Sequence, residues 1–280
     1  AFIGLIVLTY IPLIAVFGLS FFKWGGTGAP EWNGINNYIK LFTTDPYFKE
    51  SIKVTVYFSL LAVVGSMVYS LIVAMLLNRK IPARGFFRAV FYLPYVLPAA
   101  AVYIGWSWLY NTEWGLFNYI LSKLGIERLM FVSSSSQVVP SLALIAVWLS
   151  GNLIVIFLAG LQNVPRVYHE AAEIDGANAW QRFWHVTFPS MTPIIFYNML
   201  MSLITNMQVV TPALALTKGG PGKSSYFMSY MLYNYAFKQR GKIGLACAIA
   251  FVLFLLIGAF TLLLFATSKS WIFYEGGDDK

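Results

Sequence analysis

Midway between two long apolar segments lies the sequence Glu170-Ala171-Ala172-Glu173-Ile174-Asp175-Gly176-Ala177. This polar island holds three acidic residues within six positions, whereas 142–161 and 183–216 contain no Asp, Glu, Lys or Arg. If the flanking segments cross a membrane, the island must face water or another protein, because lipid offers polar groups no partners. The island therefore bears directly on how the chain is organised.

The composition indicates a chain folded in lipid. Of 280 residues, 59% are hydrophobic and 11% are charged, whereas soluble domains are about 45–50% apolar and about 25% charged. Intrinsic disorder is excluded, because it requires few apolar residues and many charges. The formal net charge is +8, but the basic residues are spread over several loops. They therefore favour contact with lipid head groups over nucleic acid, which needs one basic face.

Stretches without Asp, Glu, Lys or Arg predict the membrane spans, because a helix needs about 20 apolar residues to cross a bilayer. We expect an all-α polytopic membrane protein, a single transmembrane domain over 1–280 with six transmembrane helices. The first stretch is long for a signal peptide and lacks a basic flank, so we expect it to be retained. The stretches are residues 1–22, 54–78, 89–112, 129–165, 183–217 and 243–268.

The loop charges give a mixed indication of topology. With six spans, both termini share side one with the loops 78–88 and 163–182, and the remaining loops lie on side two. Side two carries more Lys and Arg in total, but 78–88 is the densest basic cluster and contains no acid. Short loops near span ends carry most weight, which favours side one as cytoplasmic. On side two, the aromatic residues of 224–238 predict a short amphipathic helix in the membrane plane.

Patterns that suggest catalysis are incomplete. Gly222-Lys223-Ser224 ends like a phosphate-binding loop, but Thr217 stands where that motif needs glycine. His169 and His185 do not form a metal-ligand spacing, and Cys247 has no second cysteine to pair with. The apolar spans lack the acids that mark ion paths. We expect no catalytic residue, no metal and no cofactor bound by this chain.

Neutral polar residues within the spans are candidates for a substrate site. Trp148 and Asn152 are four positions apart, as are Ser202 and Asn206, so each pair shares a helix face. An aromatic ring with several amides suits a neutral polyhydroxylated ligand. Hydrogen bonding between helices is the alternative interpretation of such residues. The set of neutral polar residues is Ser150, Asn152, Ser202, Thr205, Asn206 and Gln208.

The island itself predicts a helix, a turn and a second helix. Pro165 suits the first turn of a helix, where its missing N–H is not needed. The small residues Ala171 and Ala172 would let another surface approach closely. Asp175-Gly176 favours a turn, after which 177–186 can form a second short helix. The segment is either a docking element or a solvated loop between spans.

The island resembles the EAA loop of bacterial ABC-importer permeases. The flanking motifs are similar to the carbohydrate-type branch, which includes the maltose-transporter permeases, and the resemblance covers about residues 50–268. It implies the type I ABC importer permease fold, with 163–186 as a cytoplasmic coupling loop. The matching motifs are Phe183, Pro189 and Pro193 after the island, Arg84-Gly85-Phe86-Phe87-Arg88, Tyr92-Leu93-Pro94, Leu216-Thr217-Lys218-Gly219-Gly220-Pro221-Gly222, and Tyr235-Ala236-Phe237.

The resemblance also implies partners. They are a second permease subunit, two ATP-binding-cassette subunits that hold ATP and Mg, and an extracellular or periplasmic solute-binding protein. Docking on the ATPase would place side one and both termini in the cytoplasm, with the chain in a bacterial plasma (inner) membrane. Glu170 would be the charged contact, and Gly176 a turn that cannot carry a larger side chain. The implied coupling residues are Glu170, Ala171, Ala172, Asp175, Gly176 and Ala177.

By the same resemblance, the sugar site lies on the spans before and after the loop. Val209 follows Gln208 where the family often has a second amide, so the hydrogen-bonding set differs. We expect a neutral saccharide to be moved by alternating access. Glycerol phosphate or another polyol is an alternative, although binding an anion would require Arg or Lys in these spans. A channel or membrane-embedded enzyme would need charged or metal-binding residues there. The implied substrate residues are Trp148, Asn152, Ser202, Asn206 and Gln208.

Overall fold

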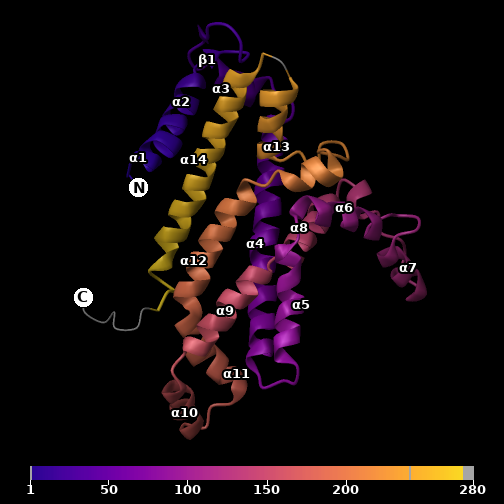
Figure 1. The fold of residues 1–280 in the computed structure, drawn as a ribbon, viewed down its shortest axis with the longest axis vertical. Coiled ribbons are helices and arrows are strands. Elements are labelled where there is room, and N and C mark those ends of the chain that lie inside the picture. Colours follow the sequence, from indigo (N-terminus) through magenta and orange to yellow (C-terminus); the bar gives the residue numbers. More distant parts are fainter. Residues whose placement is uncertain (1, 240, 274–280) are drawn as a thin grey trace. The chain divides into compact units, whose positions relative to one another are not determined.

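The computed structural model describes residues 2–239 and 241–273, and the chain divides into two compact units (Figure 1). Unit 1 comprises Ala1–Phe58, Tyr103–Leu142 and Met207–Ala259. Unit 2 comprises Ser59–Val102, Ala143–Asn206 and Phe260–Lys280. Each unit is therefore built from segments that are distant in sequence.

Helices dominate the described residues, as the composition predicts. Their order is α1 (Phe2–Leu5), a π-helical turn (Ile6–Tyr10), α2 (Ile11–Leu19), β1 (Phe22–Lys23), β2 (Glu31–Trp32), α3 (Asn36–Thr43), α4 (Phe48–Asn78), α5 (Arg84–Val96), α6 (Ala99–Leu109), α7 (Leu116–Lys123), a 3-10 turn (Phe131–Ser133), α8 (Val138–Trp148), α9 (Gly151–Asn163), α10 (Arg166–Ile174), α11 (Ala179–Arg182), a π-helical turn (Phe183–Thr187), α12 (Phe188–Met207), a π-helical turn (Ala213–Thr217), α13 (Met228–Tyr233), a π-helical turn (Asn234–Lys238) and α14 (Ile243–Ser268).

Among the described residues, three helices are long and apolar enough to cross a membrane: Phe2–Leu19, α4 and α14. Two further spans are possible if bent pairs count as one each, α5 with α6 at 100° and α8 with α9 at 50°. The stretches 89–112 and 129–165 thus each contain a bent pair of helices. α12 has 20 residues, which is long enough for the sixth span, but it is more polar and is not in this set.

Both bends have a local cause. Leu97 precedes Pro98 and has the extended conformation, φ −70° and ψ 144°, that a residue before proline favours. At the second bend, the Ser150 hydroxyl donates to the Val147 carbonyl at 2.6 Å and lies 2.9 Å from the Ser70 hydroxyl on α4. These side-chain bonds fix the interruption between α8 and α9.

Unit 2 is packed through glycines that allow helices to approach closely. A Cβ on Gly151 would lie 2.6 Å from the Phe91 carbonyl oxygen, so α9 packs directly against the α5 backbone. On Gly160, it would lie 2.9 Å from the Met191 sulfur on α12. Small residues at helix contacts are typical of membrane bundles, where close packing replaces the hydrophobic effect.

Unit 1 has an aromatic and aliphatic core. The rings of Phe58 and Phe227 lie 5.0 Å apart, and the Met228 backbone N–H donates to the Thr55 hydroxyl at 2.9 Å. The buried Asn37 amide donates to the Ser20 carbonyl at 2.7 Å and holds α3 against the end of α2. These contacts order the loops on side two.

A tyrosine cluster lies within unit 1, in the segment 224–238. The helix there begins at Met228, and Met228, Tyr230 and Met231 are buried, so this part of the segment packs into protein. The Tyr235 hydroxyl donates to the Asp45 carboxylate. Burial, together with neighbouring Tyr230, Asp45 and Tyr47, raises the pKa of Tyr226 to about 12, and burial also raises that of Tyr235.

Candidate functional site

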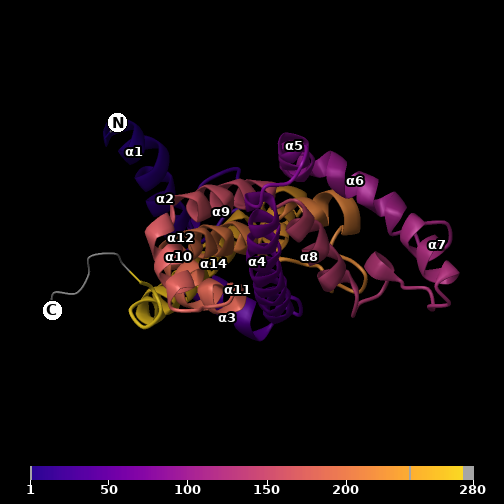
Figure 2. The ribbon, with the colours of Figure 1, turned by 90° about the horizontal axis from the view of Figure 1, so that it is seen from below.

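The loop between α9 and α12 forms the predicted helix, turn and helix in unit 2. α10 follows Pro165, and α11 lies beside it (Figures 1 and 2). The turn between them depends on Gly176, which has φ +77°. Its N–H bonds the Glu173 carbonyl at 3.0 Å, and the Ala177 N–H bonds the Ala172 carbonyl at 2.9 Å. These bonds satisfy carbonyl groups at the end of α10.

The backbone conformation of Gly176 disfavours a larger side chain. A Cβ at this position would meet no atom within 4 Å, so space is not the constraint. The left-handed conformation, with φ +77°, is what disfavours other residues. The prediction that the turn cannot carry a larger side chain therefore rests on backbone conformation.

α11 starts with a capping box. The Asn178 carboxamide oxygen accepts from the backbone N–H groups of Trp180 and Gln181, both at 3.0 Å. The Gln181 side chain accepts in return from the Asn178 N–H at 2.8 Å. Arg182, at the end of α11, forms an ion pair with Glu173 of α10. Local bonds thus hold the two short helices together.

One face of α10 is exposed along its whole length. Val167, Glu170, Ala171 and Ile174 follow helical spacing, and all four are exposed. Ile174 is 86% exposed and Val167 is 65% exposed. Apolar side chains at both ends, an acid between them and a small alanine suit a protein docking surface better than a solvated loop.

The six predicted coupling residues therefore occupy different positions. Glu170 and Ala171 belong to the outward face of α10, and Asp175 and Gly176 form the exposed turn. Ala172 and Ala177 are half-buried behind it. The structure thus brings all six into one compact element. Of these residues, Glu170 and Ala171 are best placed to contact another protein.

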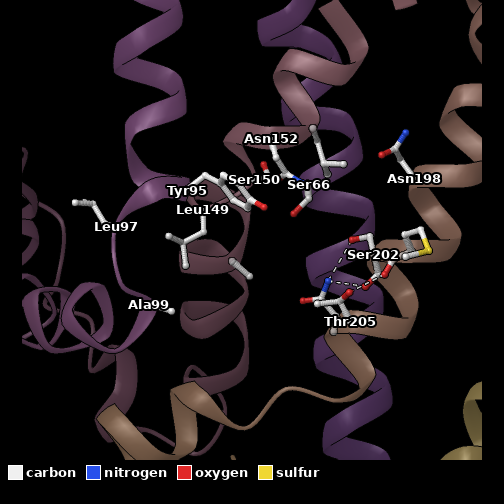
Figure 3. Close-up of a pocket in the computed structure, with 14 residues that line it drawn as sticks. Ser66, Tyr95, Leu97, Ala99, Leu149, Ser150, Asn152, Asn198, Ser202 and Thr205 are labelled. Atoms are coloured by element: carbon white, nitrogen blue, oxygen red, sulfur yellow. Dashed lines mark hydrogen bonds between the residues drawn. The ribbon is translucent and has the colours of Figure 1, made fainter. Parts of the chain in front are cut away.

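The second candidate is a cavity of about 510 Å³ inside unit 2 (Figure 3). α4, the α5–α6 connection, the bend between α8 and α9, and α12 contribute to it. Among the residues that the structure describes, its lining contains no Asp, Glu, Lys, Arg or His. The lining residues are Ser66, Tyr95, Leu97, Ala99, Ala146, Leu149, Ser150, Asn152, Leu153, Asn198, Met201, Ser202, Thr205 and Asn206.

Three of the five predicted substrate residues line this cavity, namely Asn152, Ser202 and Asn206. Trp148 and Gln208 are not in the lining, and Gln208 follows α12 at an exposed position in unit 1. Helical spacing puts Trp148 on a face with Asn152, but the α8–α9 bend interrupts that spacing, and Gln208 lies beyond the end of α12. Both are therefore outside this candidate site.

Sequence analysis missed several polar lining residues. Asn198 is four positions before Ser202 and eight before Asn206, so extending the observed spacing by one turn would have found it. Ser66 and Tyr95 come from α4 and α5, and only the fold shows that they approach α12. The neutral polar residues Ser150 and Thr205 also belong to the lining.

The amides of α12 are partly engaged within their own helix. Asn206 donates to the Ser202 carbonyl at 2.8 Å and to the Ser202 hydroxyl at 3.2 Å (Figure 3). Asn198 donates to the Ile194 carbonyl at 2.8 Å. These bonds fix the orientation of both carboxamides, and an amide also has a carbonyl oxygen that can accept. The cavity can therefore offer several uncharged hydrogen-bonding groups.

The chain matches a known family over most of its length. The profile described as "Binding-protein-dependent transport system inner membrane component" matches residues 66–270. The probable ABC transporter permease protein YesP of Bacillus subtilis is 36% identical over 99% of this chain and 90% of its own. The multiple sugar-binding transport system permease protein MsmF of Streptococcus mutans is also 36% identical, over 95% of this chain and 91% of its own.

Further relatives extend the comparison. The trehalose/maltose transport system permease protein MalF of Thermococcus litoralis is 30% identical over 92% of this chain and 87% of its own. The crystal structure of a bacterial ABC transporter that imports the acidic polysaccharide alginate contains a chain with a TM-score of 0.80. It is 20% identical and covers 96% of this chain and 92% of its own, which shows the fold.

The profile match and the relatives' identity agree with the motifs around Glu170–Ala177 and with the described apolar helices. The chain therefore belongs to the family of binding-protein-dependent transport system inner membrane components, the ABC transporter permeases, and has the type I importer permease fold.

Proposed function

We propose that this permease subunit moves a neutral saccharide across a bacterial plasma membrane by alternating access. The observation that carries the proposal is the cavity of unit 2, whose lining offers amides and hydroxyls but no charged side chain. A polyhydroxylated neutral ligand can satisfy such groups, whereas an anion would leave its charge unpaired. The names of MsmF and MalF, which refer to sugars, support the same substrate class.

The energy for transport would come from other subunits. We propose a second permease subunit, two ATP-binding-cassette subunits that hold ATP and Mg, and a solute-binding protein on side two. The exposed face of α10, with Glu170, Ala171 and Ile174, would enter a cleft of the ATPase. This docking would put side one and both termini in the cytoplasm. Closing of the ATPase would then move the helices joined to the loop.

The experiment is uptake into proteoliposomes that contain the purified transporter complex, with ATP inside and the binding protein outside. Labelled maltose and trehalose are compared with a glucuronate-containing disaccharide and with glycerol 3-phosphate. ATP-dependent uptake of a neutral disaccharide is the expected result. Preferred uptake of either anion would contradict the neutral substrate. Uptake of any of them without the ATPase subunits would contradict the ABC mechanism and favour a channel.

A further inference from the structure

α5 and α9 pack against each other in opposite directions within unit 2. Near the start of α9, Gly151 approaches the backbone of Phe91 and Tyr92. Near its end, Gln162 lies beside Arg84 and Arg88 of α5. The two arginines are four positions apart, so they share the face of α5 that meets α9.

The two guanidinium groups share one neutral acceptor. Guanidinium nitrogens can only donate, so the Gln162 carboxamide must turn its oxygen towards them. In that orientation, the oxygen accepts from Arg84 at 3.0 Å and from Arg88 at 3.1 Å. Two positive charges therefore converge on an atom that carries no formal charge.

The cluster lacks a counter-ion among the residues that the structure describes. The ion pairs found there join other residues, and neither Arg84 nor Arg88 has a carboxylate within 4.0 Å. Arg84 also donates its Nε–H to the Leu77 carbonyl at 2.6 Å. The buried Nε of Arg88 has no hydrogen-bond partner. Like charges held together with an unsatisfied buried donor indicate a missing anion.

The surroundings indicate what kind of anion fits. Phe86 and Phe87, on the same helix, are 66% and 41% exposed, and Val90 is exposed as well. A pair of arginines beside exposed apolar side chains, at the end of a membrane helix, suits a phosphate that carries acyl chains.

We propose that Arg84 and Arg88 bind the phosphate of an anionic phospholipid at the side-one surface of the membrane. Arg88 would donate its Nε–H to a phosphate oxygen, and a guanidinium is well shaped to contact phosphate through two parallel N–H groups. The exposed side chain of Phe87, three positions from Arg84, would contact the acyl chains. Because Gln162 lies at the end of α9, the bound lipid would also stabilise the start of the loop 163–186.

Thermal unfolding of the purified full-length chain in neutral detergent tests this site. Added phosphatidylglycerol should raise the Tm by about 3 °C or more, and phosphatidylcholine should not. Arg88→Gln should lose most of this shift, whereas Arg88→Lys should keep part of it. Arg79→Gln removes one charge from the same basic loop and serves as the matched control, with a shift like that of the unmodified chain.

Three results would overturn the proposal. An undiminished phosphatidylglycerol shift in Arg88→Gln would show that the arginine does not bind the lipid. An equal shift with phosphatidylcholine would show that the phosphate charge is not recognised. An equal shift with water-soluble glycerol 3-phosphate would assign the site to a free anion. If Arg88→Gln does not fold, native mass spectrometry of Arg84→Gln should still show fewer bound phosphatidylglycerol molecules than Arg79→Gln, and equal numbers would contradict the site.

Discussion

The loop between α9 and α12 and the cavity beside α12 differ in how their residues are held in place. The loop is organised by bonds between near neighbours, such as those from Asn178 to Gln181. The cavity is assembled from α4, α5, the α8–α9 bend and α12. A single change can therefore disrupt the loop locally, whereas the cavity should lose its contacts one at a time.

The largest effect is expected at the turn of the loop. Gly176→Val places a β-branched residue at φ +77°, where even an unbranched residue costs about 1–2 kcal/mol. The turn should change conformation and displace α11 from α10, so ATP-dependent uptake by the reconstituted complex should fall at least about tenfold. Gly176→Asn should retain more activity, because asparagine tolerates this conformation better.

Gly258→Val is the matched control for this change. Gly258 lies in α14, has no positive φ, and has no neighbour within 4 Å of an added Cβ. Uptake should stay within about twofold of normal, since valine has only slightly lower helix propensity than the best residues. Normal uptake in Gly176→Val, together with normal ATP hydrolysis, would show that transport does not need the backbone conformation of this turn.

Smaller effects are expected from single cavity residues. Asn206→Leu removes one amide that a saccharide can bond, which is worth about 1.5 kcal/mol or roughly a tenfold rise in Kd. Equilibrium binding of labelled saccharide to the purified complex, without the binding protein, measures this directly. Gln208→Leu is the control, because Gln208 is outside the lining, and its Kd should change less than about twofold. A larger effect at Gln208 than at Asn206 would show that the saccharide binds near Gln208 and not in this cavity.

This difference between regions also explains what the sequence could predict. The loop was predicted well because Pro165, Ala171, Asp175 and Gly176 act through their own backbone and nearest neighbours. Its internal ion pair was not predicted, since Glu173 and Arg182 meet only after the chain has turned.

The cavity could be predicted only in part. Ser202 and Asn206 share a helix face, and the spacing alone finds them. Trp148 shares helical spacing with Asn152 but is outside the lining, because the chain bends between them, and that bend includes a hydrogen bond between Ser150 and the distant Ser70. Such a contact depends on how helices pack, which spacing within one helix does not describe.

A still smaller effect is expected when the cap of α11 is removed. Asn178→Ala deletes the side-chain acceptor of the Trp180 and Gln181 N–H groups, which costs about 1 kcal/mol. Hydrogen exchange in 178–187 should quicken roughly fivefold, and uptake should fall by less than in Gly176→Val. Asn163→Ala, at the end of α9, should leave this exchange unchanged. Unaltered exchange in Asn178→Ala would show that the capping box does not hold the loop.

The smallest effect is expected from pH on saccharide binding by the cavity. Within the described part of the chain, its lining contains no Asp, Glu, Lys, Arg or His, and Tyr95 is the one titratable side chain there. The Kd of a neutral saccharide for the purified complex, without the binding protein, should therefore vary less than about twofold between roughly pH 5.5 and 8.5, where histidine is the side chain that ordinarily titrates. ATP hydrolysis, measured in parallel, can change over the same range because the loop and its partner carry titratable groups. A Kd that changes tenfold within this range would mean that a charged residue outside this cavity contacts the substrate.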